Sequence, residues 1–373
     1  MNILITGGAG FIGSNLAKTL VARGHAVTVM DNLSPQIHGE NSPLLVTIQD
    51  RVRFILGDVR NRENWVAALE GQHVVVHLAA ETGTGQSMYE IERYVDVNIR
   101  GTAILLDLLA NKPHGVRKLV VASSRSIYGE GRYHCSNHGI IYPLARSAGD
   151  MERGDFHVKC PDCKKDAELM ATTEDSQIHP SSIYGITKQN QEQMILTIGA
   201  SLDIPAIALR YQNVYGPGQS LTNPYTGILS IFSTRIKNGN EIIIFEDGEE
   251  SRDFVFIDDV VDATVSSIEM TDAGQHTLNI GSGVRTSVLN VARSLISAYS
   301  ADVPVKVSGN FRLGDIRDNY ADITKARTLL GFKPKVNFEM GIGRFAAWVN
   351  SQDVMEDAFE SSISEMRTKG LFK

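Results

Sequence analysis

Cysteine is scarce in this chain. Only three cysteines occur among 373 residues, and all of them lie between positions 135 and 163. So few thiols, confined to one segment, exclude the disulfide framework of a small secreted protein. No apolar run approaches the roughly 20 residues that are needed to span a bilayer. We also expect no signal peptide, because the first strand pattern begins at residue 2. We therefore expect a cytoplasmic protein.

An excess of positive charge is also lacking. The formal net charge is −7, which disfavours non-specific binding to nucleic acid or to an anionic membrane. We expect neither partner. What is present is an ordinary globular composition, with 42% hydrophobic and 21% charged residues. The chain is long enough to form a main domain and a smaller second lobe.

The most informative segment is residues 2–13, where a short apolar strand runs into a glycine turn and the start of a helix. Such a turn brings backbone N–H groups and the positive end of a helix dipole up to a pyrophosphate. Gly7 allows the tight turn, Gly10 the close approach of the backbone, and Gly13 the packing of helix on strand. A second strand ends in Asp31, whose carboxylate can bind an adenosine ribose and repel a 2′-phosphate. The pattern predicts NAD rather than NADP.

Strand and helix patterns alternate through the first half of the chain, which predicts an α/β fold with a Rossmann doubly wound parallel sheet. After residue 216 the pattern breaks into shorter units, and there we expect a smaller α/β substrate-binding lobe, which includes the strand pattern at 275–281. The predicted parts are an NAD-binding domain over 1–216 with an insert at 131–173, the substrate-binding lobe over 217–350, and a C-terminal tail over 351–373.

Tyr184 and Lys188 are four residues apart, so on a helix they share a face. A phenol has a pKa of about 10 and is a poor base at neutral pH. A neighbouring ammonium lowers that pKa, which would make Tyr184 a usable general base. Ser124 follows an earlier strand, at the edge where ligands of such sheets bind, and it could hydrogen-bond the same substrate hydroxyl.

These motifs resemble the extended short-chain dehydrogenases/reductases that act on sugar nucleotides, the NAD-dependent epimerase/dehydratase family. The resemblance covers nearly the whole chain and implies Tyr184 as base, Ser124 as hydroxyl partner and Lys188 as the group that holds the nicotinamide ribose. The implied NAD-binding residues are Gly7, Gly10, Phe11, Ile12, Gly13, Asp31, Asn32, Asp58, Val59, Leu78, Ala79, Ala80, Asn98, Ser123, Tyr184, Lys188 and Tyr211. The implied substrate-binding residues are Thr82, Ser124, Arg125, Asn213, Tyr225, Arg252 and Arg312.

One departure from the family pattern narrows the reaction. Family dehydratases and decarboxylases carry an additional acid or base beside the serine, whereas here Arg125 and Ser126 follow Ser124. This favours 4-epimerisation, with NAD as a bound catalyst that is not consumed. Arg125 could contact the substrate or form a nearby salt bridge, and both alternatives stay open.

Further motifs at 81–88 and 210–227 resemble a bacterial subgroup that includes dTDP-L-rhamnose 4-epimerases, which make dTDP-6-deoxy-L-talose. The resemblance thus implies that substrate. The alternatives are a UDP-glucose/UDP-galactose 4-epimerase and a nucleotide-sugar 4-ketoreductase or dehydrogenase. A scaffold that binds NAD without catalysis is a third alternative, and the intact Ser124, Tyr184 and Lys188 argue against it.

The insert holds every cysteine of the chain. Cys135 and His138 form a Cys-x₂-His pair, and Cys160 and Cys163 form a Cys-x₂-Cys pair. This spacing predicts one tetrahedral zinc site with a structural role, because four protein ligands leave no open position. His134 or His157 could replace His138. The competing interpretation is an unstructured loop with incidental cysteines.

Quaternary structure is predicted from two helix patterns, at 94–110 and 188–198. Each has a long apolar face, and together they could form the four-helix bundle of a homodimer. Alternatively, each helix covers only its own sheet.

Overall fold

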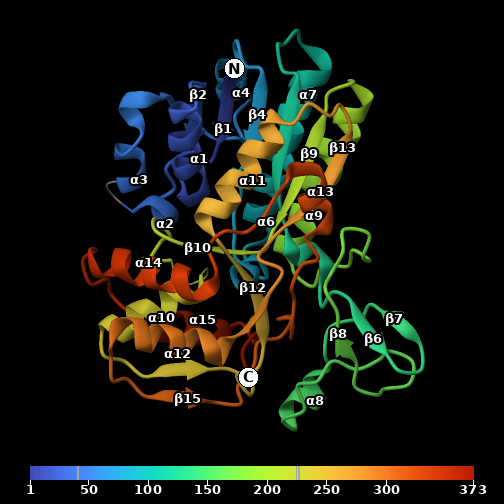
Figure 1. Cartoon of the computed structure of the whole chain (residues 1–373), viewed down its shortest axis with the longest axis vertical. Coiled ribbons are helices and arrows are strands. Elements are labelled where there is room, and N and C mark those ends of the chain that lie inside the picture. Colours follow the sequence, from blue (N-terminus) through green and yellow to red (C-terminus); the bar gives the residue numbers. More distant parts are fainter. Residues whose placement is uncertain (40–41, 224, 226) are drawn as a thin grey trace.

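The computed structural model describes residues 1–39, 42–223, 225 and 227–373 (Figure 1). At its centre lies a seven-stranded sheet in the order β13-β9-β5-β4-β1-β2-β3, and every pair of neighbours in it is parallel. The strands are β1 (Asn2–Thr6), β2 (Ala26–Asp31), β3 (Arg53–Leu56), β4 (Val74–His77), β5 (Lys118–Ser124), β9 (Ala206–Tyr211) and β13 (Gln275–Ile280). The predicted doubly wound parallel sheet is confirmed.

Helices cover both faces of this sheet. On one face pack α1 (Phe11–Ala22) and α11 (Ile257–Glu269), and on the other α4 (Arg62–Leu69), α7 (Gly101–Asn111) and α9 (Ile183–Ser201). Successive strand residues serve opposite faces: Ile3 and Ile5 join the first cluster, and Leu4 joins the second. Because both faces are buried, the strands read as continuous apolar runs.

The placement of β13 corrects the sequence-based prediction. We assigned residues 275–281 to the smaller lobe, but β13 pairs in parallel with β9 from Gln275↔Ala206 to Ile280↔Tyr211. The chain leaves the sheet after β9, builds part of the lobe, and returns through α11. A short strand pattern carries no information about which sheet it joins, and for that reason the return was missed.

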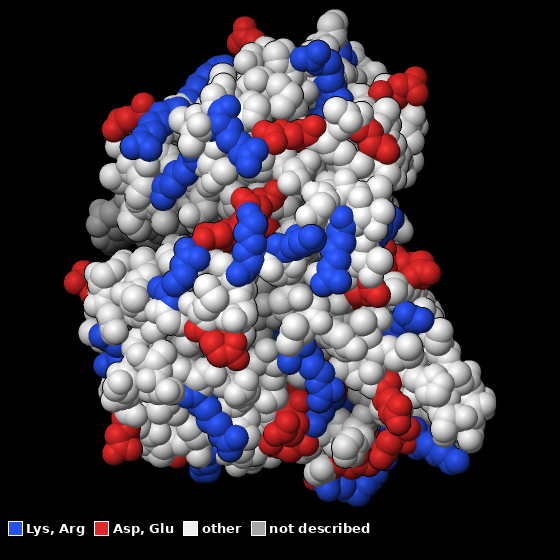
Figure 2. Space-filling model, viewed as in Figure 1, with Lys and Arg blue, Asp and Glu red and all other residues white. Residues whose placement is uncertain are grey.

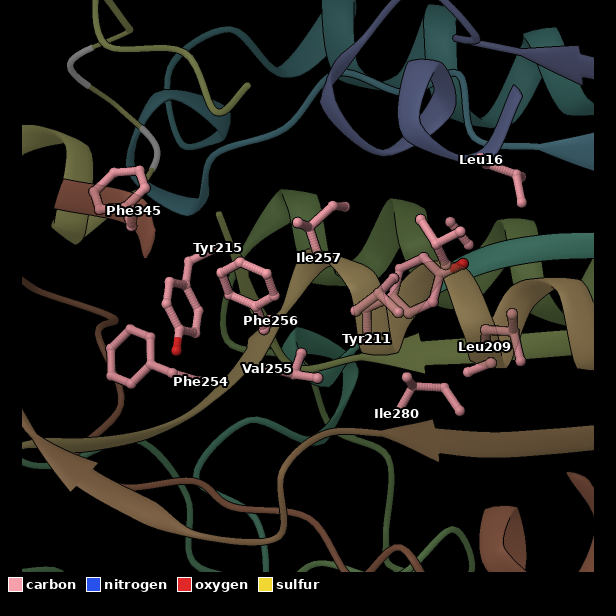
Figure 3. Packing of buried hydrophobic residues seen from close by; sticks show 14 of the residues in the cluster. Leu16, Leu209, Tyr211, Tyr215, Phe254, Val255, Phe256, Ile257, Ile280 and Phe345 are labelled. Carbon is pink, nitrogen blue, oxygen red and sulfur yellow. The ribbon is translucent and has the colours of Figure 1, made fainter. Parts of the chain in front are cut away.

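The smaller lobe contains two short sheets and three main helices. Its strands are β10 (Asn213–Tyr215), β12 (Ser251–Phe256) and β14 (Arg285–Ser287) in one sheet and β11 (Ile242–Ile244) and β15 (Val305–Val307) in the other. Its helices are α10 (Ile228–Lys237), α12 (Val288–Tyr299) and α14 (Phe338–Asn350). The short helix α13 (Thr324–Leu330) packs against β13 and α11 of the main domain. Figure 3 shows that the two lobes share one core: Leu16 and Leu209 of the main domain continue into Phe256 and Tyr215, whose rings lie edge to face at 5.4 Å.

The insert and the tail both lie against the smaller lobe (Figure 1). The insert forms β6 (Tyr133–Cys135), β7 (Gly139–Ile141), β8 (Glu168–Leu169) and α8 (Ala148–Glu152). The tail forms α15 (Phe359–Thr368), whose Phe359 and Ile363 pack with Phe372 against Phe245 of the lobe. The remaining short helices are α2 (Pro35–His38), α3 (Pro43–Val46), α5 (Thr84–Ser87) and α6 (Ile91–Tyr94).

The helix pattern at 94–110 is realised in two pieces. A π-helical segment, Val95–Arg100, connects α6 to α7.

Within the described residues, no helix is both long and apolar enough to traverse a bilayer. On the face shown in Figure 2, basic and acidic side chains are interspersed over both lobes.

Candidate active site

A cavity of about 450 Å³ opens where β1, β2, β4, β5 and β9 end. Parallel sheets bind ligands at this edge. The structure brings most of the predicted NAD-binding residues to it, and from that set Gly7, Gly10, Phe11, Ile12, Gly13, Asp31, Asn32, Val59, Leu78, Ala79, Ala80, Ser123, Tyr184, Lys188 and Tyr211 line the cavity.

The glycine turn at the floor of the cavity has no room for side chains. Gly7 has a φ of +67°, and a Cβ there would lie 2.8 Å from the backbone nitrogen of Ala79. A Cβ on Gly13 would lie 2.4 Å from the carbonyl oxygen of Gly7. The turn thus places the first residues of α1 directly against the cavity, with N–H groups that have no partner within the helix. These residues fit a dinucleotide pyrophosphate.

The carboxylate of Asp31 is held in one orientation at the end of β2. Its Oδ2 accepts from the backbone N–H of Ala9 and its Oδ1 from that of Leu33, both at 3.0 Å. The imidazole Nε2 of His38 lies 3.1 Å from the same Oδ1. Asp31 and His38 both line the cavity. A fixed carboxylate at this place suits a free ribose and opposes a 2′-phosphate. The contact with His38 was not predicted.

Two residues of the predicted NAD-binding set do not line the cavity, but support segments that do. The amide of Asn98 accepts from the N–H of Glu81 at 2.7 Å, and donates to the carbonyl of Glu81 at 3.1 Å and to Thr187 Oγ1 at 2.9 Å. Asp58 is paired with Arg60 at 2.8 Å and accepts from Asn32. Partial burial would raise the pKa of Asp58, but its hydrogen bonds to Arg60 and Asn32 lower it to about 2.

Ser124, Tyr184 and Lys188 line the same cavity although they come from β5 and α9. Helix α9 begins at Ile183, where Ser182 caps it by accepting from the N–H of Gly185. This cap places Tyr184 in the first turn. Burial raises the pKa of Tyr184, while a hydrogen bond with Ser124 and the positive charge of Arg125 act to lower it.

Lys188 forms a hydrogen bond within its own helix. Its Nζ donates to Gln191 Oε1 at 2.6 Å, and burial lowers the pKa of Lys188 to about 7. Gln191 in turn donates to Thr102 Oγ1 at 2.9 Å and lies 3.2 Å from His77 Nε2. The expectation that Lys188 lowers the pKa of Tyr184 stays a prediction, and the groups that act to lower this pKa in the structure are Ser124 and Arg125.

The predicted substrate-binding residues fall into three groups. Thr82, Ser124, Arg125 and Asn213 line the cavity, and Arg125 Nε donates to Asn213 Oδ1 at 2.9 Å.

Arg252 and Arg312 belong to an adjoining cluster around Asp315. Arg252 Nη2 lies 3.1 Å from Asp315 Oδ1, and the guanidinium of Arg312 lies 4.8 Å from the ring centre of Phe245. Burial would raise the pKa of Asp315, but the positive charges of Arg252, Arg312 and Arg125 hold it below its usual value.

The loop after β10 contributes residues that we did not name from the sequence. Gln219, Ser220 and Asn223 line the cavity. The hydroxyl of Tyr225, which we predicted to bind substrate, instead donates to Glu365 of α15.

The insert brings its four predicted ligands together. The ligand atoms of Cys135, His138, Cys160 and Cys163 all lie within 4.8 Å of one another. Cys135 Sγ is 3.6 Å from Cys163 Sγ, and His138 Nδ1 is 3.2 Å from Cys160 Sγ. A tetrahedral zinc ion with ordinary bond lengths requires ligand separations of roughly 3.5 to 3.8 Å. The four side chains thus form a cluster of thiols and an imidazole with separations near those values, the donor set that zinc prefers. His134 and His157 lie outside this group.

The chain matches the NAD dependent epimerase/dehydratase family over residues 3–149 and 159–281. It is 39% identical over 349 residues to a dTDP-L-rhamnose 4-epimerase of Burkholderia thailandensis, which covers 93% of this chain and 94% of that protein. The chain belongs to this family. It is also 32% identical over 354 residues to a UDP-glucose 4-epimerase of Mycolicibacterium smegmatis, with 92% and 97% covered.

Solved structures of family members have the same architecture. The UDP-glucuronic acid 4-epimerase from Bacillus cereus, in complex with UDP-glucuronic acid and NAD, gives a TM-score of 0.77 at 26% identity over 94% of this chain and 99% of that one. The UDP-glucose 4-epimerase from Thermotoga maritima, with UDP-glucose, gives 0.75 at 31% identity with the same coverage. The family resemblance inferred from the sequence is confirmed.

Proposed function

We propose that this protein is an NAD-dependent nucleotide-sugar 4-epimerase that converts dTDP-L-rhamnose to dTDP-6-deoxy-L-talose. The observation that carries the proposal is the cavity in which Ser124 and Tyr184 face the glycine turn while Arg125 stands where a further acid or base would be needed for loss of water or CO₂. The relative from Burkholderia thailandensis supports the choice of sugar. UDP-glucose is the alternative substrate, because a UDP-glucose 4-epimerase is also similar over most of the chain.

Tyr184 acts on the hydroxyl proton at C4. NAD, when bound in the cavity, supplies reversible oxidation and reduction at C4 and ends each turnover unchanged. The phenol oxygen of Tyr184 takes the proton of the C4 hydroxyl and later returns it, while Ser124 hydrogen-bonds the same oxygen. Arg125 assists because its positive charge offsets part of the rise that burial causes in the pKa of Tyr184.

Binding of the cofactor is assigned to three groups that line the cavity. The turn of Gly7, Gly10 and Gly13 would hold the pyrophosphate, Asp31 the adenosine ribose, and Lys188 the nicotinamide ribose. Gln191 positions Lys188 through its 2.6 Å hydrogen bond.

Inversion at C4 requires that the sugar present both faces while its diphosphate stays anchored. Arg252 and Arg312 would provide this anchor, because guanidinium groups bind phosphate oxygens bidentately. They stand beside Asp315, which also pairs with Arg252, so that the anchor is held in place by a carboxylate.

The proposal is tested by an NMR assay of the purified protein with no added cofactor, against dTDP-L-rhamnose and UDP-glucose separately. We expect conversion of dTDP-L-rhamnose to its C4 epimer. Conversion of UDP-glucose alone would correct the substrate. If the protein turns over only a 4-keto sugar, and only with added NAD(P)H, the assignment as an epimerase is wrong and the protein is a reductase.

We also propose that Cys135, His138, Cys160 and Cys163 bind a structural zinc ion. The buried core of the insert is small and consists of Tyr133, Cys135, Ile141, Val158 and Cys160. So few buried side chains stabilise a fold weakly, and ligation of a metal supplies folding free energy that burial does not. Atomic emission analysis of the purified protein should give one zinc per chain.

A homodimer completes the proposal. Ile91, Val95 and Ile186 are each at least 40% exposed, on elements that pack side by side. Exposed apolar side chains on neighbouring helices favour burial against a second copy. Light scattering should give twice the mass of the chain, and Ile186→Glu should reduce it.

A further inference from the structure

The insert is fixed to the smaller lobe by Arg146. The side chain of Arg146 is only 3% exposed and forms a bidentate pair with Glu246, which follows β11. Nη1 lies 2.6 Å from Glu246 Oε2, and Nη2 lies 2.7 Å from Oε1. Such fork geometry specifies orientation as well as energy. The insert is therefore held in a defined position against the lobe.

The same guanidinium also holds a backbone segment of the lobe. Arg146 Nη2 donates to the carbonyl oxygen of Asp315 at 3.2 Å. Glu130, which immediately precedes the insert, accepts from the backbone N–H of Arg317 at 2.8 Å and lies 3.3 Å from Arg146 Nε. Arg146 and Glu130 thus bind the backbone on both sides of Ile316.

Apolar packing extends this contact toward the other end of the segment. Met151 and Phe156 of the insert pack with Phe311, and Leu313 packs against the same cluster. Residues 311–317 therefore rest on the insert along their length. This segment carries Arg312 and also Asp315, which pairs with Arg252.

Arg146 itself does not line the cavity. It therefore acts on a ligand only through the segment that it holds. When Arg146 is removed, Glu246 keeps Arg317 at 3.0 Å, whereas Glu130 loses the guanidinium at 3.3 Å and keeps the Arg317 N–H. Loss of Arg146 should accordingly release the segment and also lower the stability of the fold, because a buried carboxylate loses its charge partner.

We propose that the inserted segment is a substrate-positioning element, in which Arg146 sets the position of residues 311–317 and thereby the affinity for a nucleoside diphosphate sugar. The proposal rests on the proposed function, since it takes Arg252 and Arg312 as the groups that face the diphosphate. Arg146 is a positioning residue, and the NAD-binding turn lies in the other lobe. Replacement of Arg146 should weaken binding of the substrate and leave the amount of bound NAD unchanged.

The test compares Arg146→Met with the wild-type holoenzyme. We expect KM to rise about tenfold or more, since displacement of a binding group by about 1 Å can cost up to about a hundredfold. We expect kcat and the NAD content per chain to change little, and the melting temperature to fall because Glu130 loses its charge partner. Arg146→Lys keeps the positive charge but cannot form the bidentate pair, and its KM should lie between those of wild type and Arg146→Met. The control is Arg153→Met in the same insert, whose side chain is 71% exposed, and it should behave as wild type.

Calorimetric binding of dTDP separates this proposal from the proposed function. Weaker dTDP binding by Arg146→Met, with NAD retained, supports the positioning role even if the wild-type enzyme epimerises neither sugar. An unchanged KM and unchanged dTDP affinity would overturn it. Loss of NAD together with a lower kcat would also overturn it, because that pattern reports a general structural role.

Discussion

Lys188 Nζ and Gln191 Oε1 lie 2.6 Å apart within the wall of the cavity, and both side chains are buried. Gln191 continues the contact to Thr102 and His77, so that Lys188 belongs to a polar network beneath the cofactor site. Burial lowers the pKa of His77 to about 3, which keeps its imidazole neutral beside the ammonium. The network orients Lys188 toward the cavity.

Gln191→Ala should therefore impair catalysis without unfolding the protein. The variant removes the acceptor of Lys188 and leaves its ammonium free to rotate, and we expect kcat to fall by about tenfold to a hundredfold. Steady-state kinetics and circular dichroism measure the two effects. Asn190→Ala, at a partly exposed neighbouring position of α9, is the control. Equal activity of both variants would contradict the role of Gln191.

Arg125 should set the pH dependence of turnover. Its charge lowers the pKa of Tyr184, so Arg125→Met should raise that pKa. A base works only when deprotonated, and a higher pKa moves the acidic limb of the kcat profile to higher pH. At pH 7 we expect kcat to fall by about tenfold. Arg125→Lys keeps the charge and should keep the limb closer to that of wild type. An unshifted limb in Arg125→Met would show that the charge does not act on the base.

Tyr184→Phe should separate binding from chemistry. The variant lacks the phenol oxygen that takes and returns the proton, and we expect turnover to fall by at least about a thousandfold. NAD and zinc should remain bound at wild-type levels, since the glycine turn and the insert are untouched. Absorbance of the released cofactor and metal analysis check this. Appreciable residual turnover would assign the base to another group.

The metal site should distinguish two histidines that are close in sequence. His138→Ala removes a ligand atom that lies 3.2 Å from Cys160 Sγ, and we expect loss of zinc and a lower melting temperature. His134→Ala is the matched control, because His134 is exposed on β6 and lies outside the ligand group. Zinc retained by both variants, or lost by both, would contradict the assignment.

The parts of the site that could be predicted are those fixed by short stretches of backbone. The turn from Gly7 to Gly13 needs glycine because neighbouring backbone leaves no space for a Cβ. Tyr184 and Lys188 share a helix face because their spacing is one turn. The ligand pairs beginning at Cys135 and Cys160 could be named for the same reason, since each is a local knuckle.

Residues whose role depends on distant packing were not predictable. Gln191 is one more polar residue on a helix until α7 brings Thr102 to it. Arg146 has no local pattern, and its partner Glu246 comes from the other lobe. The strand β13 was misplaced because its pairing with β9 is decided by the crossover through α11. In each case the sequence defines the side chain, and the tertiary fold selects its partner.

We propose that C4 is inverted by transfer of its own hydrogen to NAD and back, while Tyr184 moves only the hydroxyl proton. The most direct measurement uses dTDP-L-rhamnose carrying deuterium at C4, incubated in ordinary water with the purified enzyme and no added cofactor. We expect NMR to find the C4 epimer with the deuterium still at C4. Loss of the label to solvent, or no epimer without added NAD(P)H, would contradict it.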